Sequence, residues 1–385
     1  MGMVPFRRSA ATCALMKFDL TRAGALSALE AMRPLLGRRY ADSRNTDHGA
    51  DGRATTSRLS PYLRRRLLLE PEVVAAARAD HGEAAEKFVQ EVFWRTYFKG
   101  HLETRPWLWT DYLQGVELAR ARLAGSSGLN TAYLAAVEGR TGIDGFDDWA
   151  RALVADHWLH NHTRMWFASI WIFTLRLPWE LGADFFARHL IDFDPASNTL
   201  SWRWVAGLHT RGKHYVARAE NIRRYTAGRY DPQGLDETPE PLDEAEGPPA
   251  AKLAPADVPG AGEMALLVHL DDLNPETLEL GAARIIRVCP HARHIPGVLA
   301  PVLAADAVAM DDTLRRASAH FGCPVAADAG GLPTVSAWAP VGPSAEGLGD
   351  CLRVRRSWDS AVWPRSGRGF FKVKEAIPGV LAGQV

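Results

Sequence analysis

Residues 192–204, with the sequence DFDPASNTLSWRW, concentrate polar and aromatic side chains in thirteen positions. Two acids one residue apart, Asp192 and Asp194, stand before a proline, and Asn198 follows shortly after. Two tryptophans, Trp202 and Trp204, flank an arginine. Taken alone, the acids predict the cap of a turn and the tryptophans predict core positions. The meaning of this stretch therefore depends on the rest of the chain.

The size and composition of the chain indicate a globular protein with two domains. Its 385 residues exceed the length at which one hydrophobic core usually stops growing, and 47% of them are hydrophobic. The longest apolar run, MWFASIWIFTL, is too short to cross a bilayer, and the N-terminus has no proper signal peptide. We therefore expect a cytoplasmic protein, with no membrane contact.

The cysteines are widely spaced, which favours free buried thiols over a zinc or iron–sulfur site. No metal is predicted. The four residues concerned are Cys13, Cys289, Cys323 and Cys351.

Charge is distributed unevenly although the net charge is zero. Residues 1–232 carry 32 Lys and Arg against 25 Asp and Glu, whereas residues 233–385 carry 13 against 20. A basic first part suggests a polyanionic partner, and a solvated surface is the simpler explanation of so modest an excess. Between them, residues 236–263 are rich in proline, glycine and acids, which predicts a linker.

Hydrophobic periodicity differs on the two sides of this linker. Apolar residues recur at three- and four-residue steps in the segments 20–36, 71–102, 130–142, 147–158 and 181–191, which predicts helices. After the linker, the runs 264–270, 283–289 and 323–327 have strand length, and 303–322 is expected to be a helix stopped by glycine. The predicted fold is mainly α, with a helical domain at 15–235, a linker at 236–263 and a small α/β domain of unknown role at 264–385.

Three segments of the first part could carry chemistry. In EKFVQEVFWRTYFKG, helical spacing places Glu91, Trp94 and Arg95 on one face, where they could hold a planar ligand or form a core tryptophan with an ion pair. In ADHWLHNHTRMWFASIW, a predicted helix, one apolar stripe holds polar residues that need buried partners. That stripe consists of Trp158, Asn161, Arg164, Met165 and Ala168.

The histidines of the second segment, His160 and His162, do not share a face, so we expect surface or core positions for them rather than a metal pair. The third segment, ATTSRLSPYLRRRLL, puts hydroxyls before a helix start. Such a start can hold phosphate, and it is also a common cap. The chain has no GxGxxG or GxxxxGK[ST] fingerprint and no internal repeat.

Together, TTSRLSPYL, EVFWRTYF, WLHNHTRM and DFDPASNTLSWRW resemble, in order and approximate spacing, the flavin-binding helical domain of the photolyase/cryptochrome family. The resemblance covers roughly residues 20–232 and is nearest to the photolyases that act on cyclobutane pyrimidine dimers. It implies FAD as the cofactor and a monomer that repairs UV-damaged DNA, single- or double-stranded, by light-driven electron transfer from reduced FAD.

The resemblance also implies a role for each matching residue. Asp192 would pair with Arg164 beside the flavin, Asp194 would take a flavin hydrogen bond, and Asn198 would face the reactive central nitrogen. A neutral amide at this position can stabilise a reduced flavin without donating a proton of its own. The remaining cofactor-binding residues implied are Tyr40, Thr56, Ser57, Leu59, Ser60, Arg95 and Asn161.

A flipped pyrimidine dimer would be stacked on tryptophan and hydrogen-bonded by an acid and an amide. The residues implied are Glu91, Trp94, Asn161, Met165 and Trp204, with Asn198 acting through the flavin. Enzymes for the (6-4) photoproduct carry histidines near positions 161 and 165, and this chain does not.

Tryptophans should relay electrons to the flavin from the surface. Trp202 and Trp179 match the first two members of the family's relay, and Trp109 is the predicted third, with Trp107 as a rival.

The chain also departs from the family. The segment before Leu20 has no room for the usual antenna domain, so no antenna pigment is predicted, and Phe88 stands where some members have tryptophan. After Trp204, a basic stretch could contact DNA phosphate or be a solvated loop. Its cations are Arg211, Lys213, Arg218, Arg223 and Arg224. The alternative functions are a cryptochrome-like blue-light photosensor and a flavin-binding scaffold without photochemistry.

Overall fold

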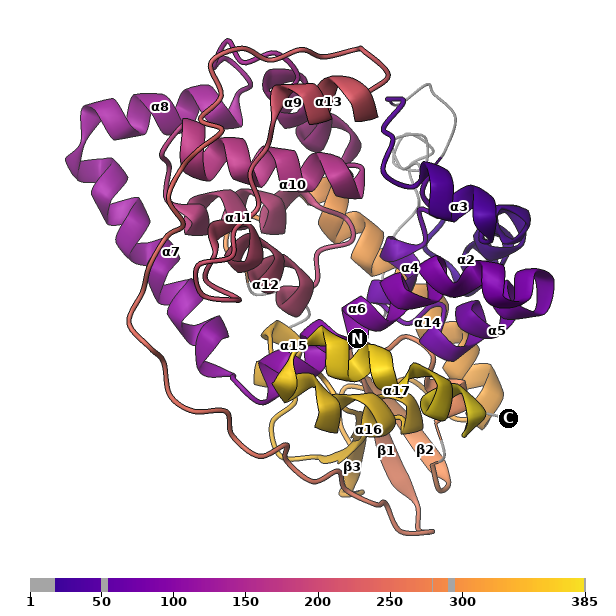
Figure 1. The fold of residues 1–385 in the computed structure, drawn as a ribbon. Helices are drawn as coiled ribbons and strands as arrows, with labels where there is room; N and C mark the ends of the chain where they lie inside the picture. The colour runs from indigo at the N-terminus through magenta and orange to yellow at the C-terminus, as the bar shows by residue number, and fades with distance from the viewer. Residues whose placement is uncertain (1–17, 50–54, 279, 290–294, 384–385) are drawn as a thin grey trace.

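The computed structural model describes residues 18–49, 55–278, 280–289 and 295–383. Cys13 and positions 15–17 of the predicted helical domain lie outside these ranges. Helices fill the chain up to Tyr225, and a small parallel sheet with its own helices follows, so the mainly α fold with a later α/β part is confirmed (Figure 1).

The helical part consists of twelve described helices, several of which begin with a cap that the sequence supplies. Thr21 caps the first of them by accepting a hydrogen bond from the Gly24 N–H. The helices are α2 (Arg22–Met32), α3 (Arg38–Ser43), α4 (Ser60–Arg64), α5 (Glu70–His81), α6 (Glu86–Glu103), α7 (Trp107–Gly125), α8 (Ser127–Val137), α9 (Phe146–Asp156), α10 (Asn161–Ser169), α11 (Trp179–His189), α12 (Pro195–Ala206) and α13 (Ala219–Tyr225).

Two predicted helices are each broken by a residue with a left-handed backbone. The segment 71–102 divides into α5 and α6 because Gly82, at φ 52°, ends α5. The stripe that began at Trp158 was wrong as a single helix, because α9 ends before His157, at φ 56°, and α10 begins only at Asn161. His160 caps α10, where its Nδ1 accepts a hydrogen bond from the His162 N–H at 3.1 Å.

Four parallel strands form the sheet of the second part. They are β1 (Met264–Val268), β2 (Ala283–Val288), β3 (Thr334–Ala337) and β4 (Leu352–Val354), in the order β2-β1-β3-β4. The strands predicted at 264–270 and 283–289 are confirmed. The run 323–327 forms only one parallel bridge, between Val325 and Ile286. Its predicted neighbour is confirmed as α14 (Ala300–Phe321), and Gly322 follows it at φ 63°.

The described strands also include two that the periodicity did not indicate, β3 and β4, because each has at most four residues and shows no clear pattern. Three further helices complete the second part. They are α15 (Pro343–Gly347), α16 (Ser357–Val362) and α17 (Phe370–Ala382).

Three consecutive arginines at the C-terminal end of α4 hold the two parts together. Arg64 Nη1 lies 3.2 Å from Asp271, Arg65 Nε donates to Asp306 at 2.9 Å, and both Asp359 oxygens accept from Arg66 Nη2 at 2.7 Å. All three guanidinium groups are buried. One apolar cluster also runs from Leu29 and Val92 of the helices to Leu266 and Val335 of the sheet. Because the two parts share this core, they are not separated by a clear break in packing. The predicted domain boundaries stay a prediction.

The predicted linker has neither helix nor strand, but it is held to the surface at several points. Leu242 N–H donates to the Ala206 carbonyl at 2.9 Å, Ala251 N–H to the Thr104 carbonyl at 2.8 Å, and Asp257 N–H to the Arg353 carbonyl at 3.0 Å. It runs as an extended chain down one side of the molecule to the sheet (Figure 1). The segment thus works as a strap along both parts.

Candidate functional site

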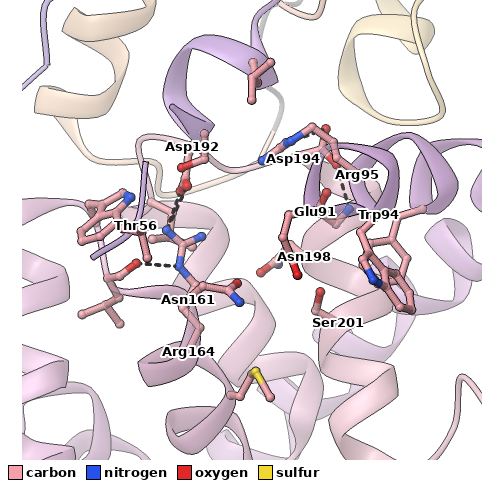
Figure 2. Close-up of a pocket in the computed structure, with 18 of the residues that line it drawn as sticks. Thr56, Glu91, Trp94, Arg95, Asn161, Arg164, Asp192, Asp194, Asn198 and Ser201 are labelled. Atoms are coloured by element: carbon pink, nitrogen blue, oxygen red, sulfur yellow. Dashed lines mark hydrogen bonds and ion pairs between the residues drawn. The ribbon is translucent and has the colours of Figure 1, made fainter. Parts of the chain in front are cut away.

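One cavity collects every residue that the sequence assigned to cofactor and lesion binding. Its volume is ≈ 360 Å³, within the range of small-molecule sites. Its walls come mainly from α4, α6, α10 and α12 (Figure 2). The predicted residues that line it are Tyr40, Thr56, Ser57, Leu59, Ser60, Glu91, Trp94, Arg95, Asn161, Arg164, Met165, Asp192, Asp194, Asn198, Trp202 and Trp204. Their individual roles stay predictions.

The pairing expected between Arg164 and Asp192 is confirmed. Arg164 Nη2 donates to the two Asp192 oxygens at 3.0 and 2.9 Å, and its Nε donates to the Leu159 carbonyl at 3.1 Å (Figure 2). Burial by itself would raise the pKa of Asp192, but the charge and hydrogen bond of Arg164 hold it below its usual range. The carboxylate is therefore kept ionised in a buried position.

Asp194 caps α12 and also faces two cations. Its Oδ1 accepts from the Ser197 N–H at 2.7 Å, while Oδ2 lies 3.5 Å from Lys99 Nζ and 3.8 Å from Arg95 Nη1. Burial opposes ionisation, but Lys99 and Arg95 lower the pKa of this carboxyl to about 2. The capping interpretation and a ligand-facing role are thus compatible, because they use different oxygens.

Asn198 follows one turn later in α12 and also lines the cavity. Its Nδ2 donates to the Ala183 carbonyl of α11 at 2.9 Å, which fixes the orientation of the amide. The amide oxygen is the group left to face the cavity.

On α6, Glu91, Trp94 and Arg95 lie on one face, and all three line the cavity. Arg44 Nη1 donates to Glu91 Oε1 at 2.8 Å. Burial nevertheless raises the pKa of Glu91, and the charge of Arg44 opposes this only in part. A cavity-lining carboxyl can exchange a proton or a hydrogen bond with a bound ligand.

The two tryptophans expected to hold the lesion have ring partners already. Trp94 stacks on Phe370 of α17, with ring centres 3.7 Å apart and planes at 10°. Trp204 stacks on Tyr215 at 5.6 Å. Both remain half-buried and line the cavity, which suits rings that add a further stacking partner.

The predicted relay leads away from the cavity through buried rings. Trp202 lines the cavity, and its edge touches α11 at Gly182, where an added Cβ would lie 2.3 Å from the ring. Trp179 stands three residues before Gly182, on the same face of α11. The ring of Tyr112 lies between Trp179, at 5.8 Å, and Trp109, at 5.4 Å.

Trp109, the member expected nearest the surface, is only 4% exposed. Its Nε1 lies 3.3 Å from Glu346 of α15, so the second part of the chain covers it. Trp107 is half-buried, and Gly247 of the strap packs against its ring. The choice between these two tryptophans stays open.

Arg211 and Lys213 lie in the exposed segment after α12 and do not line the cavity. Arg211 Nη2 donates to Asp243 of the strap at 2.8 Å, and both side chains are at least 70% exposed. DNA binding by these two residues stays a prediction. His160 and His162 are both buried, which confirms core positions for them.

Some cavity residues carry hydrogen-bonding groups that the described chain leaves unused. Arg95 Nη1 and Ser197 Oγ are buried and make no hydrogen bond with any described residue. Such groups are costly to bury unless a ligand completes them. Together with the Arg164–Asp192 pair and Asn198, they form a donor and acceptor set that fits a large polar cofactor such as a flavin dinucleotide.

Other residues that support this site were not predicted from the sequence. Arg44 and Lys99 neutralise Glu91 and Asp194, and Phe370 comes from the far end of the chain. Only Lys99 had a signal that could have revealed it, because it follows Arg95 at helical spacing.

Several negative findings concern the described residues alone. Across 18–49, 55–278, 280–289 and 295–383, no helix is long and apolar enough to span a membrane. Nor do the His, Cys, Asp and Glu residues of these ranges gather in a group that could hold a metal. Of the described cysteines, Cys289 and Cys323 are buried as predicted, whereas Cys351 is only partly buried.

Known proteins resemble this chain over its helical part. Residues 88–235 match the family model described as the FAD binding domain of DNA photolyase. A deoxyribodipyrimidine photo-lyase from Streptomyces griseus is 34% identical over 185 residues, which cover 44% of this chain and 38% of that protein. One from Thermus thermophilus is 32% identical over 212 residues, covering 55% and 47% of the two chains.

Among solved structures, a class III photolyase from Agrobacterium tumefaciens is similar at a TM-score of 0.45 and 26% identity, over 54% of this chain and 43% of that one. The chain thus spans less than half the length of the relatives that it matches.

Proposed function

Because residues 88–235 belong to the family of FAD-binding domains of DNA photolyases, we propose that this protein binds FAD and uses light to split cyclobutane pyrimidine dimers in DNA. The observation that carries the proposal is that one cavity holds two sets of residues. The Arg164–Asp192 pair and Asn198 form a polar set suited to a flavin, and Glu91, Trp94, Asn161, Met165 and Trp204 form a set suited to two linked pyrimidines of one strand.

In this proposal, Arg164, Asp192, Arg95 and Asn198 hold the flavin rings. The hydroxyls of Ser57 and Ser60, which lie where α4 begins, hold the phosphates and sugar together with Tyr40, Thr56 and Leu59. When bound and reduced, FAD supplies an electron to the dimer on illumination and takes it back after the ring has split. The ionised Asp192 balances the charge of Arg164, so that the pair binds polar groups without adding net charge to the site.

The residues around the lesion act by stacking and hydrogen bonding. Trp94 and Trp204 offer ring faces to the two flipped bases, and Met165 fills the space between polar groups. Glu91 and Asn161 hydrogen-bond the polar edges of the bases. Burial raises the pKa of Glu91, which favours the protonated carboxyl, the form that can donate a hydrogen bond to a base carbonyl.

The test is restoration of thymine absorbance in UV-irradiated oligothymidine by the reduced full chain under blue light. We expect repair in the light and none in the dark. Trp94→Ala should lose about tenfold or more in substrate affinity because one stacking face is removed, whereas Trp94→Phe should lose less. Leu118→Ala, on the exposed surface of α7, is the matched control.

Two results would overturn the proposal. If the purified protein does not bind FAD, the cofactor site is wrong. If FAD is bound and photoreduced but neither single-stranded nor duplex substrate is repaired, the photosensor function is favoured instead. A specific contact makes this second function worth testing, since Phe370 of the C-terminal part lies directly on Trp94.

A further inference from the structure

The helix α17 opens with two phenylalanines that face opposite ways. Phe370 is 8% exposed and packs in the core, whereas Phe371 is 79% exposed. Among the exposed large hydrophobic residues of the described chain, Phe371 is the only one with an aromatic ring. A single exposed apolar side chain is common on protein surfaces, so the meaning of this ring depends on what surrounds it.

The surface around this ring is basic. Residues 363–374 contain four basic side chains, all exposed, and no acid. Lys374 and Glu375 both follow Phe371 at helical spacing and so lie beside its ring, and Lys372 balances the charge of Glu375 through an ion pair at 2.7 Å. The other two cations are Arg365 and Arg368. This positive patch stands in a half of the chain that is otherwise acidic, with 20 acids against 13 basic residues over 233–385.

The patch is connected to the cavity wall through Phe370. Phe370, the residue before Phe371, stacks on Trp94 at 3.7 Å and meets the edge of Tyr97 at 5.8 Å. Trp94 is itself a wall of the cavity. The helix α17 lies along α6 (Figure 1), and its residues Val373 and Val380 are buried in the shared core. The backbone that carries Phe371 is therefore held against α6, one ring behind the cavity wall formed by Trp94.

We propose that Phe371 is a stacking platform for an unpaired nucleobase of the DNA strand whose lesion enters the cavity, and that Arg368 and Lys374 contact the phosphates of the same strand. This inference rests on the proposed function, because that function supplies the nucleic acid. An aromatic ring surrounded by cations is the arrangement with which proteins bind single-stranded nucleic acid. A protein-docking surface would instead need a contiguous apolar patch, and the neighbours of Phe371 are charged.

The experiment measures the affinity of the full chain for undamaged, fluorescein-labelled oligothymidine by anisotropy, with single-stranded and duplex forms compared. We expect Phe371→Ala to weaken single-strand binding about tenfold, because one base loses its stacking partner. Phe371→Trp should bind as well as the unchanged protein, and Phe371→Leu should resemble the alanine variant. Leu118→Ala, which removes an exposed apolar side chain from α7, should change nothing.

The cations have a separate test. Arg368→Gln should lower the slope of log affinity against log salt by about 0.7, the value for one phosphate contact on a single strand. It should do so for oligonucleotides of any sequence, because phosphate contacts carry no sequence information. An unchanged slope in both Arg368→Gln and Lys374→Gln would remove the phosphate part of the inference.

The outcomes also separate this inference from the proposed function. If the unchanged protein fails to repair dimers but its single-strand binding still depends on Phe371, the proposed function falls and the inference stands. Equal oligonucleotide affinity for Phe371→Ala and the unchanged protein overturns the inference, whatever the repair activity. If Phe371→Ala instead alters only the sedimentation of the protein, the ring is a contact between copies, and the inference is again overturned.

Discussion

Glu103 should make the stability of this protein fall as the pH rises through neutrality. It is the last residue of α6, and its carboxylate accepts hydrogen bonds from Trp338 Nε1 at 3.1 Å and from the Val341 N–H at 2.7 Å. Both donors belong to the segment that follows β3. Burial raises the pKa of Glu103 to about 7, although the two hydrogen bonds and Arg355 oppose the shift.

The folded protein binds the proton of Glu103 more tightly than the unfolded chain does. Between the ordinary value of 4.5 and about 7, the folded protein holds a proton on Glu103 that the unfolded chain has released. The stabilisation that this proton gives is complete below 4.5 and is lost as the pH rises through 7. At 1.36 kcal/mol per unit, the full shift is worth about 3 kcal/mol, of which about 2.5 kcal/mol falls between pH 5 and pH 8.

The change that isolates this effect is Glu103→Gln, which keeps the size of the side chain but cannot titrate. Other carboxyls with raised pKa, such as Asp359 and Glu180, also respond to pH, so the quantity to measure is the difference between the two proteins. Urea unfolding followed by tryptophan fluorescence at pH 5, 6, 7 and 8 gives this difference. The glutamine variant should gain about 2.5 kcal/mol on the unchanged protein from pH 5 to pH 8.

Glu117→Gln is the matched control, because it removes a carboxylate that is 72% exposed in a surface pair with Arg120. A difference curve for Glu103→Gln that stays flat within about 0.5 kcal/mol across the same pH range would refute the reasoning. It would mean that Glu103 keeps its charge at no cost where α6 meets the sheet.

Three further changes test other parts of the structure. Asp359→Asn should cost about 3 kcal/mol in urea unfolding, because it leaves the buried Arg66 short of a carboxylate, whereas Glu375→Gln, in an exposed pair, should cost less than about 0.5 kcal/mol. Gly182→Ala should lower the free energy of unfolding by about 1–3 kcal/mol and change the fluorescence of Trp202, because the new Cβ would lie 2.3 Å from its ring. The control is Gly128→Ala, whose new Cβ would have no atom within 4 Å and should not destabilise the protein. In the strap, Glu244→Gln should lower the free energy of unfolding by about 1–2 kcal/mol, because its partner Arg203 is only 6% exposed. Asp243→Asn, which faces an exposed Arg211, should leave the stability almost unchanged. Similar losses in both variants would contradict this account.

Sequence reasoning could predict the elements and residues whose signal is local. The periodicity of α6 places Glu91, Trp94 and Arg95 on one face, and that face lines the cavity. Glycines mark the ends of α5 and α14, and the first two strands have clear apolar runs. The remaining residues of the cavity were predicted from the order of the four motifs. A family resemblance indicates which distant segments of a chain meet in space, whereas periodicity does not.

Contacts between residues far apart in the chain left no such signal. Arg66 and Asp359 are separated by 293 positions, and Arg65 and Asp306 by 241. The run of three arginines among leucines did not indicate which acids would pair with it, because those acids lie far along the chain. For the same reason, the stacking of Phe370 on Trp94 was not predictable, and the two parts were expected to be more separate than the shared core makes them.

The stretch 192–204 shows why the structural and functional interpretations of one sequence need not compete. Asp194 uses Oδ1 to cap α12 and directs Oδ2 towards Arg95 and Lys99. Trp202 is a core residue, 2% exposed, and the same ring also forms part of the cavity wall. The cap and the core packing hold these side chains in place before any ligand binds. The same contacts that stabilise the fold therefore preorganise the binding site. Asp194→Ala removes the cap and should therefore loosen Asn198 as well. Asp194→Asn removes only the charge, so a comparison of the two variants separates the two effects.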